Sequence, residues 1–452
     1  MAIPEQHKWR YIFHFTDIHN LDSIIKNGLL CPNEKKQKGI THTNIANMTI
    51  QERRAKMDVT AGPRGKVHDY VPFYFSSMNP MLLTLLNQKN IDQPLIIYLC
   101  LKIDILEKED AVFTDASANR NELPNFFDDT TQLDKLDWDL IDSRKWSVET
   151  DDAKHKKMAE ALIYHSVKIE QIDGIVVYNN QIKEVVERIF KANKKRPPKI
   201  MFDHDRCIKN YIFYYKKFFI KGQEYDTLIT GPLMLACKYK KLIENVIAER
   251  KKCKDHTYKS IKEIVDVIEE NFGVIQELHD IEGLMQDYPP HNDTVDAHTR
   301  RVVEEMKKQD YYQCASNDIK ELLLFAAYLH DIGKGPKDKW KNKIITRAYP
   351  DHPADAIPML KRILTEDITS LSDEEIRKIC MLVVYHDIVG ECMEQRRDIK
   401  QIAQIITCEE DLEMLFAISV ADTKAINPTW ATSIVDRKEY FCYEVIEEWK
   451  RP

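Results

Sequence analysis

The pattern of apolar residues changes once along this chain, and that change limits the fold more than any other feature. Up to about residue 200, turn residues and helical segments separate short strand-like runs: YIFHF (11–15), VPFYF (71–75), PLIIYLCLKI (94–103) and GIVVY (174–178). From about residue 235 onward, apolar residues recur with helical spacing, as in IKELLLFAAYLHDI (319–332). The first part predicts an α+β domain rather than a regular βαβ series, and the second an all-α domain. We therefore expect an N-terminal domain at 1–205, a helical linker at 206–265 and a helical bundle at 266–452.

Composition excludes several classes of protein. The net charge is −7, so contact with nucleic acid would need a local basic patch rather than a global field. The ten cysteines include no CxxC pair, which argues against a zinc ribbon or a disulfide framework and favours a reducing compartment. The start, MAIPEQHKWR, lacks the apolar core of a signal peptide, and the longest apolar run, 322–329, is too short to span a bilayer. We expect a cytoplasmic protein without a membrane partner.

One strand-like segment, VHDYVPFYF (67–75), carries a proline in its middle. Because Pro72 cannot donate to a β-ladder, it should confine the strand to a sheet edge, a bulge or an irregular turn. The polar start and the aromatic run that follows also suit a wall on which a flat ligand stacks. Both interpretations, a half-buried edge strand and a ligand wall, are open at this point.

Four N-terminal segments resemble one family as a set. They are HFTDIHNLDSIIKNGLL (14–30), ERRAKMDVTAGPRGKVHDYVPFYFSSMNPML (52–82), AVFTDASANR (111–120) and AEALIYHSV (159–167). In their order, their spacing and the residues they contain, these segments resemble the DarT family of NAD-dependent DNA ADP-ribosyltransferases over about residues 9–200. The resemblance implies a split β-sheet fold of the ADP-ribosyltransferase type, NAD as co-substrate, and a toxin-like glycosyltransferase activity.

The chemistry of this reaction agrees with the residue types. Breaking the bond between nicotinamide and ribose passes through an oxocarbenium-like state, which a neighbouring carboxylate stabilises. Glu160 is the candidate, although a glutamate in AEALI could also be a solvated helix residue. Arg54 could clamp the diphosphate or stabilise negative charge on the acceptor, and the resemblance favours a catalytic role. The resemblance implies a NAD-binding set of His14, Thr16, Asn20, Gly28, Tyr70, Phe73 and Tyr74.

The resemblance also implies that the acceptor is a base of single-stranded DNA, with thymine favoured and guanine as the alternative; RNA stays open. The expected reading surface is the loop from about 111 to 150, where Arg120, Arg144, Lys145 and Trp146 are the predicted DNA-binding residues. The same loop is rich in aspartate, so a helix-capping surface segment is the competing interpretation. Relatives of this kind meet their antidote as a separate protein, so a separate antitoxin is an expected partner.

A second set of residues lies in the helical part. Five His-Asp dipeptides occur, and only YLHDIGKG (328–335) ends an apolar helix in a Gly-Lys turn. With VDAHTRRVVEEM upstream and FAISVADTKA downstream, it resembles the HD-domain phosphohydrolase superfamily over about 270–430. The resemblance implies a divalent metal (Mn, Mg, Fe or Zn) held by His298, His330, Asp331, His352, His386 and Asp422, with Lys334 near a substrate phosphate.

Two functions remain at this stage. In the first, the chain transfers ADP-ribose from NAD to DNA, and a fused HD domain reverses, processes or regulates the modification. In the second, the HD domain is the main enzyme, a metal-dependent nucleotidase or phosphodiesterase with a regulatory NAD-binding domain.

Overall fold

A computed structural model describes the chain except residues 1, 44–47, 119–122, 144–147, 149, 203–216, 221–222, 227–228, 254, 395 and 452. The chain separates into two compact units, one of residues 1–87 with 91–216 and one of residues 88–90 with 217–452. The first unit is a mixed α/β domain and the second is helical, as the change of apolar pattern predicts. The segment expected as a linker contributes helix α9 (Pro232–Arg250) to the second unit, where α9 packs against α15 (His352–Arg362) and α16 (Asp373–Val384).

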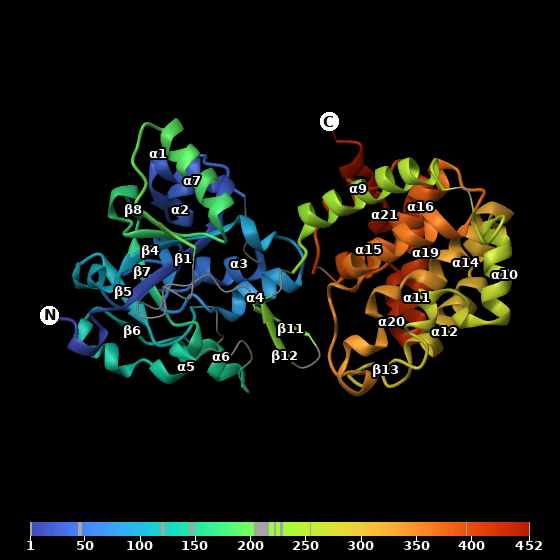
Figure 1. Cartoon of the computed structure of the whole chain (residues 1–452). Helices are drawn as coiled ribbons and strands as arrows, with labels where there is room; N and C mark the ends of the chain where they lie inside the picture. Colours follow the sequence, from blue (N-terminus) through green and yellow to red (C-terminus); the bar gives the residue numbers. More distant parts are fainter. Residues whose placement is uncertain are drawn as a thin grey trace. The chain divides into compact units, whose positions relative to one another are not determined.

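An eight-stranded sheet forms the centre of the N-terminal unit, in the order β10-β9-β4-β1-β3-β7-β5-β6. Its strands β1, β4, β5, β6 and β7 are labelled in Figure 1. Its strands are β1 (Tyr11–Asp17), β3 (Tyr70–Tyr74), β4 (Ile96–Lys102), β5 (Ala111–Thr114), β6 (Phe126–Phe127), β7 (Glu160–Tyr164), β9 (Gly174–Val176) and β10 (Lys199–Met201). All neighbours are antiparallel except β9 and β10. Helices of this unit are α1 (Leu21–Asn27), α2 (Pro32–Gln37), α3 (Met48–Lys56), α4 (Pro80–Asn87), α5 (Trp138–Asp142), α6 (Asp151–Lys157) and α7 (Asn180–Ala192).

The strand with the internal proline is not at the sheet edge. β3 lies between β1 and β7, and it pairs with β7 over its whole length. With β1, however, it is paired only at Phe13 and Tyr74, so the two strands part beyond this point. The carbonyl of Pro72 accepts a hydrogen bond from the His14 ring (Nδ1···O 2.7 Å), which places the backbone edge of Pro72 on the β1 side. A proline is tolerated inside this sheet because its missing N–H faces the open part of the ladder.

The segment that carries Glu160 is a strand, so the interpretation as a solvated helix is wrong. β7 lies between β3 and β5, and Ala161, Leu162 and Ile163 are fully buried. Apolar residues covered on both faces of a sheet form a continuous run, which resembles a helical segment in sequence. Glu160, the first residue of this strand, is 1% exposed.

The C-terminal unit is built around four helices: α12 (Val295–Lys307), α14 (Asn317–Leu329), α16 and α19 (Glu409–Ile426). α12 packs along α19 and α14, and α14 packs along α16. The remaining helices are α10 (Ile261–Glu270), α11 (Gln276–His279), α13 (Asp310–Cys314), α15, α17 (Ile388–Met393), α18 (Lys400–Ala403), α20 (Pro428–Val435) and α21 (Lys438–Trp449).

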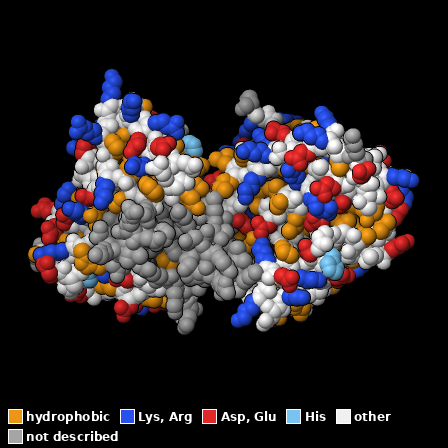
Figure 2. All heavy atoms as spheres, viewed as in Figure 1, with side chains coloured by type: hydrophobic (Ala, Val, Ile, Leu, Met, Phe, Trp, Pro, Cys, Tyr) orange, Lys and Arg blue, Asp and Glu red, His pale blue; other side chains and the backbone are white. Residues whose placement is uncertain are grey.

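Two pairs of short strands differ from the predictions. β11 (Lys217–Ile220) and β12 (Gln223–Asp226) lie in the segment predicted as a helical linker, and β13 (Met285–Gln286) and β14 (Ile344–Ile345) lie among the helices of the predicted all-α part. On the visible face of this unit, acidic and basic side chains are interspersed (Figure 2). None of the helices in the described ranges is long and apolar enough to cross a membrane.

Candidate active site and metal centre

A cavity of about 390 Å³ opens where β1 and β3 part. Its walls come from β1, α2, α3, the aromatic strand β3 and the start of β7. Its lining includes His14, Thr16, Asn20, Lys35, His42, Arg54, His68, Tyr70, Pro72, Tyr74, Ser117 and Glu160. The split in the sheet therefore brings together most of the residues predicted to bind NAD.

Glu160 and Arg54 form a buried ion pair in this cavity. The guanidinium donates to both carboxylate oxygens at 2.8 Å, and Arg54 is 7% exposed. Oε1 also accepts from the amide of Ala118 at 3.3 Å. Burial alone would lower the pKa of Arg54, but the Glu160 carboxylate outweighs it and the pKa is raised. Since a carboxylate oxygen can accept more than one hydrogen bond, Oε2 keeps a position for a substrate hydroxyl or a base N–H.

His14 and Thr16 line the cavity from β1, and Asn20 lines it from the segment that follows this strand. The Nδ1–H of His14 is fixed on Pro72, which leaves Nε2 as the ring nitrogen that can contact a ligand. Burial lowers the pKa of His14 to about 4, so the ring is neutral near pH 7. The side chain of Asn20 donates to Thr16 and to the carbonyl of Thr43, and it accepts from the Thr43 amide. Asn20 thus ties a lining loop to β1.

The aromatic residues of β3 divide between two environments because side chains alternate along a strand. Tyr70 and Tyr74 line the cavity, whereas Phe73 is fully buried in the core on the opposite face. Burial raises the pKa of Tyr74, which keeps its hydroxyl protonated. The prediction that Phe73 helps to bind NAD is therefore wrong, because its ring is buried in the core and does not line the cavity. Gly28 also lies outside the lining: it ends α1 with φ +82, and a Cβ there would stand 3.1 Å from the Val167 carbonyl.

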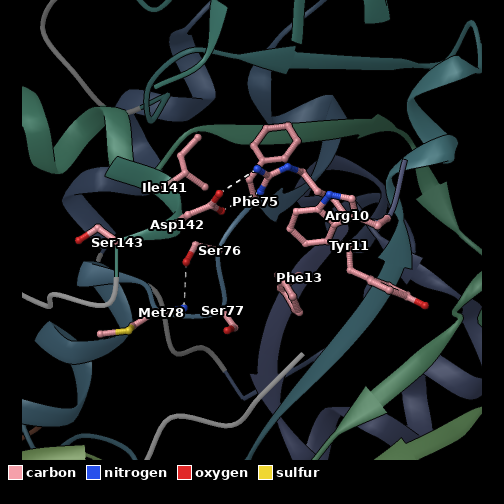
Figure 3. Close-up of a pocket in the computed structure, with 11 residues that line it drawn as sticks. Arg10, Tyr11, Phe13, Phe75, Ser76, Ser77, Met78, Ile141, Asp142 and Ser143 are labelled. Carbon is pink, nitrogen blue, oxygen red and sulfur yellow. Dashed lines mark hydrogen bonds and ion pairs between the residues drawn. The ribbon is translucent and has the colours of Figure 1, made fainter. Parts of the chain in front are cut away.

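The four predicted DNA-binding residues Arg120, Arg144, Lys145 and Trp146 lie outside the described residues. The segment before 144 is anchored by Arg10. Arg10 donates to both oxygens of Asp142 at 2.7 and 2.8 Å (Figure 3), and its guanidinium stacks on the Trp138 ring at 3.7 Å. This clamp fixes α5 to the start of β1, so the described part of the loop is held on the sheet.

Seven buried or half-buried side chains meet in the C-terminal unit. The six predicted metal ligands form three overlapping groups with a residue that the sequence interpretation missed, Asp387: His298 with His330 and Asp422; Asp331 with His352 and His386; and His386 with Asp387 and Asp422. The candidate ligand atoms of each group lie within 4.8 Å of one another. Asp331 stands between the groups, since Oδ2 lies 3.3 Å from His330 Nε2 and Oδ1 lies 3.4 Å from His352 Nε2.

Three of these histidines are held in the same way. The Nδ1–H groups of His330, His352 and His386 donate to the carbonyls of Ala327, Tyr349 and Val383 at 2.7, 2.7 and 2.8 Å, with each acceptor three residues earlier in the chain. This turns the Nε2 atom of each ring toward the cluster, where the Nε2 atoms of His352 and His386 lie 3.1 Å apart and share a hydrogen bond. His330 Nε2 is buried and has no hydrogen-bond partner among the described residues. Burial opposes the charged ring of His330, but the Asp331 carboxylate outweighs it and raises the pKa to about 9. The site therefore favours a cation, and its donors fit one.

The Gly-Lys turn after His330 has a packing role. A Cβ on Gly333 would lie 1.9 Å from the carbonyl oxygen of His352, so only glycine allows the turn to approach the start of α15 this closely. Lys334 is buried and bonds to Asp331 at 2.7 Å and to Gln286 at 2.9 Å. Lys334 thus contacts a predicted ligand directly. Asp387 belongs to one of the five His-Asp dipeptides, so a signal for it was present in the sequence.

Comparison with known proteins covers the N-terminal unit. Residues 13–208 match the family model described as ssDNA thymidine ADP-ribosyltransferase, DarT. A DNA ADP-ribosyl transferase of Thermus aquaticus is 35% identical over 183 residues, which are 39% of this chain and 79% of the relative. That of Thermus sp. (strain 2.9) is 33% identical over 201 residues, 43% of this chain and 94% of the relative. The solved structure of Thermus sp. 2.9 DarT in complex with ADP-ribosylated ssDNA has 31% identity, covers 45% of this chain and 98% of that chain, and has a TM-score of 0.41.

Proposed function

Because this chain belongs, through residues 13–208, to the DarT family of ssDNA thymidine ADP-ribosyltransferases, we propose that its N-terminal unit transfers ADP-ribose from NAD to a base of single-stranded DNA. Thymine is the favoured base and guanine the alternative. The observation that carries the proposal is the buried carboxylate of Glu160, held by Arg54 in a cavity with a tyrosine wall. The NAD-binding set reduces to His14, Thr16, Asn20, Tyr70 and Tyr74, the predicted members that line the cavity.

The chemical step assigns separate tasks to the two paired residues. The bond between nicotinamide and the ribose C1 breaks, a bond forms from that carbon to a nitrogen of the base, and the base loses a proton. Glu160 stabilises the developing positive charge on the ribose and accepts the proton of the base. Arg54 holds Glu160 in a fixed orientation and stabilises negative charge on the deprotonated base.

Mass spectrometry of an oligonucleotide tests this function. Purified protein with NAD should add one ADP-ribose unit to a single-stranded oligonucleotide, and Glu160→Gln, which keeps the size of the side chain, should abolish the addition. Two further oligonucleotides, one without thymine and one without guanine, identify the base, and an RNA of the same sequence separates DNA from RNA. If no strand gains mass with the wild-type protein, the proposal is wrong.

For the C-terminal unit we propose a metal-dependent phosphohydrolase of the HD class. The specific support is the shared anchoring of His330, His352 and His386 through Nδ1, which turns their Nε2 atoms toward Asp331, Asp387 and Asp422. A divalent ion bound there would supply a water of lowered pKa and polarise a phosphate. The residues of this unit would hold the ion: Asp331 lies beside both His330 and His352, and Lys334 neutralises part of the charge of the Asp331 carboxylate.

Two measurements test the second function. Titration of chelator-treated protein with Mn²⁺ or Mg²⁺ should raise the unfolding temperature of the C-terminal unit, and Asp331→Ala should remove this increase. The ADP-ribosylated oligonucleotide is then incubated with wild type and with Asp331→Ala. Loss of the adduct only in wild type would assign removal or processing to this unit. Equal persistence would leave regulation, or hydrolysis of free nucleotides, as its role, and a separate antitoxin would be needed for reversal.

If the protein makes no adduct but hydrolyses a nucleotide or cyclic dinucleotide with Mn²⁺ or Mg²⁺, the alternative function holds. In that case the C-terminal unit is the main enzyme, and the N-terminal cavity binds NAD as a regulatory ligand.

A further inference from the structure

The cavity of the N-terminal unit contains a cation without an acidic partner. Lys35 lies on α2 and lines the cavity, and its side chain is half-buried. Within the described ranges, no ion pair or hydrogen bond joins its ammonium group to another side chain, whereas Lys38, directly after this helix, is paired with Glu34 at 3.1 Å. Burial lowers the pKa of Lys35, as expected for a charge that has lost water and gained no counter-ion. An unpaired, partly desolvated ammonium is unfavourable in the free protein and would be stabilised by an anionic ligand.

The other cations of the lining are less suited to bind an anion. Both terminal nitrogens of Arg54 are committed to Glu160 at 2.8 Å, and Lys36 is exposed. Burial also lowers the pKa of His14, of His42 and of His68, so these rings act as neutral hydrogen-bond groups near pH 7. Glu160 is the one acidic side chain among the described lining residues, and its charge is balanced by Arg54.

Packing places Lys35 and the reactive pair on different elements of the same cavity. α2, which carries Lys35, packs against the short segment Val67–Asp69 before β3, and Asn33 of α2 donates to Asp69 at 2.7 Å. The ring of His68 in that segment lies 3.1 Å from the side chain of Gln51 on α3, the helix that carries Arg54. The segment around His68 therefore contacts both the helix of Lys35 and the helix of Arg54. A dinucleotide with its nicotinamide ribose beside Glu160 would carry its two negative charges to another part of this cavity, where the ammonium group of Lys35 can meet them.

We propose that Lys35 binds the diphosphate of NAD and thereby positions the nicotinamide ribose beside Glu160. This inference rests on the proposed transferase function. In this proposal Lys35 binds the diphosphate, and Arg54, for which the sequence left that role open, does not. A lysine meets a diphosphate as a point charge with three donors, so its contribution should depend on charge more than on shape.

Binding and kinetics of Lys35→Met test the assignment in the full chain. We expect the affinity for ADP-ribose, measured by calorimetry, to fall about 10- to 100-fold, the size of one lost charge-assisted interaction. The KM for NAD should rise by a similar factor, while the KM for the oligonucleotide stays unchanged. Lys35→Arg, which keeps the charge, should restore most of the affinity. Lys38→Met, which removes a charge directly after the same helix, is the matched control.

Three outcomes would overturn the inference. Equal binding of ADP-ribose by wild type and Lys35→Met would leave the transferase proposal intact and remove Lys35 from the diphosphate site. A rise in the KM for the oligonucleotide alone would show that Lys35 contacts the DNA backbone instead. Absence of NAD and ADP-ribose binding in the wild-type protein would remove the proposed function itself.

Discussion

Removing Arg54 alone should destabilise the N-terminal unit more than removing Arg54 together with the charge of Glu160. The two side chains are 7% and 1% exposed and share two hydrogen bonds of 2.8 Å. Arg54→Met leaves the carboxylate buried without its counter-ion, and breaking a buried pair in this way costs about 3–5 kcal/mol. In Arg54→Met/Glu160→Gln the uncompensated charge is absent, so the loss should fall to roughly 1–2 kcal/mol.

Hydrogen exchange of the strand that carries Glu160 is a suitable assay, because unfolding of a chain with two units need not be two-state. The amides of β7 should exchange much faster in Arg54→Met than in wild type, and the double variant should recover most of the protection. Arg53→Met, which changes the exposed neighbour on α3, is the control and should behave like wild type. If the double variant is as unprotected as Arg54→Met, or if Arg54→Met matches wild type, the pair does not hold the site as described.

Three further predictions concern other parts of the chain. Arg10→Ala removes the paired bonds to Asp142 and the stacking on Trp138, so α5 should lose about 1–3 kcal/mol of local stability, seen as faster amide exchange in 138–142 while β4 is unchanged. The His14 pKa is about 4 in the folded protein against 6.5 for the free side chain, so the unfolded state binds the extra proton first. The neutral, buried ring of His14 therefore contributes fully to the free energy of unfolding above pH 6.5, and this contribution is lost as the pH falls toward 4. The thermal midpoint of wild type should fall relative to that of His14→Asn over that pH range. A constant difference between the two midpoints would contradict this prediction. In Gly333→Ala the new Cβ would meet the His352 carbonyl at 1.9 Å, so the Mn²⁺-dependent rise in unfolding temperature should be lost, whereas Gly390→Ala, whose Cβ would only touch the Ser419 hydroxyl at 3.4 Å, should keep it.

The local pattern of residues was sufficient to predict most of the strands and helices. YIFHF, VPFYF and PLIIYLCLKI are strands β1, β3 and β4, because β-branched and aromatic residues between turn signals favour extended backbone wherever the strand lies. The pattern did not predict the secondary structure of the segment after Glu160, which is the strand β7. This strand is buried on both faces, so its apolar residues form a continuous run without the alternation of apolar and polar residues that marks a half-buried strand. The pattern also failed for Pro72, because the rule that keeps proline at sheet edges assumes a complete ladder on both sides, and β1 leaves that ladder open.

The sequence by itself determined which chemical groups this chain brings to each unit. Glu160, Arg54 and the histidines and aspartates of the C-terminal unit are recognisable from their neighbours along the chain. Only the tertiary structure decided how they meet. It places Tyr74 and Phe73 on opposite faces of one strand and joins Arg54 to a carboxylate 106 positions away. It also adds Asp387 to the predicted metal ligands and leaves Lys35 without a counter-ion among the described residues. The physical reason is that backbone preference acts between near neighbours, whereas pairing, burial and charge balance depend on residues that packing brings together from distant parts of the chain.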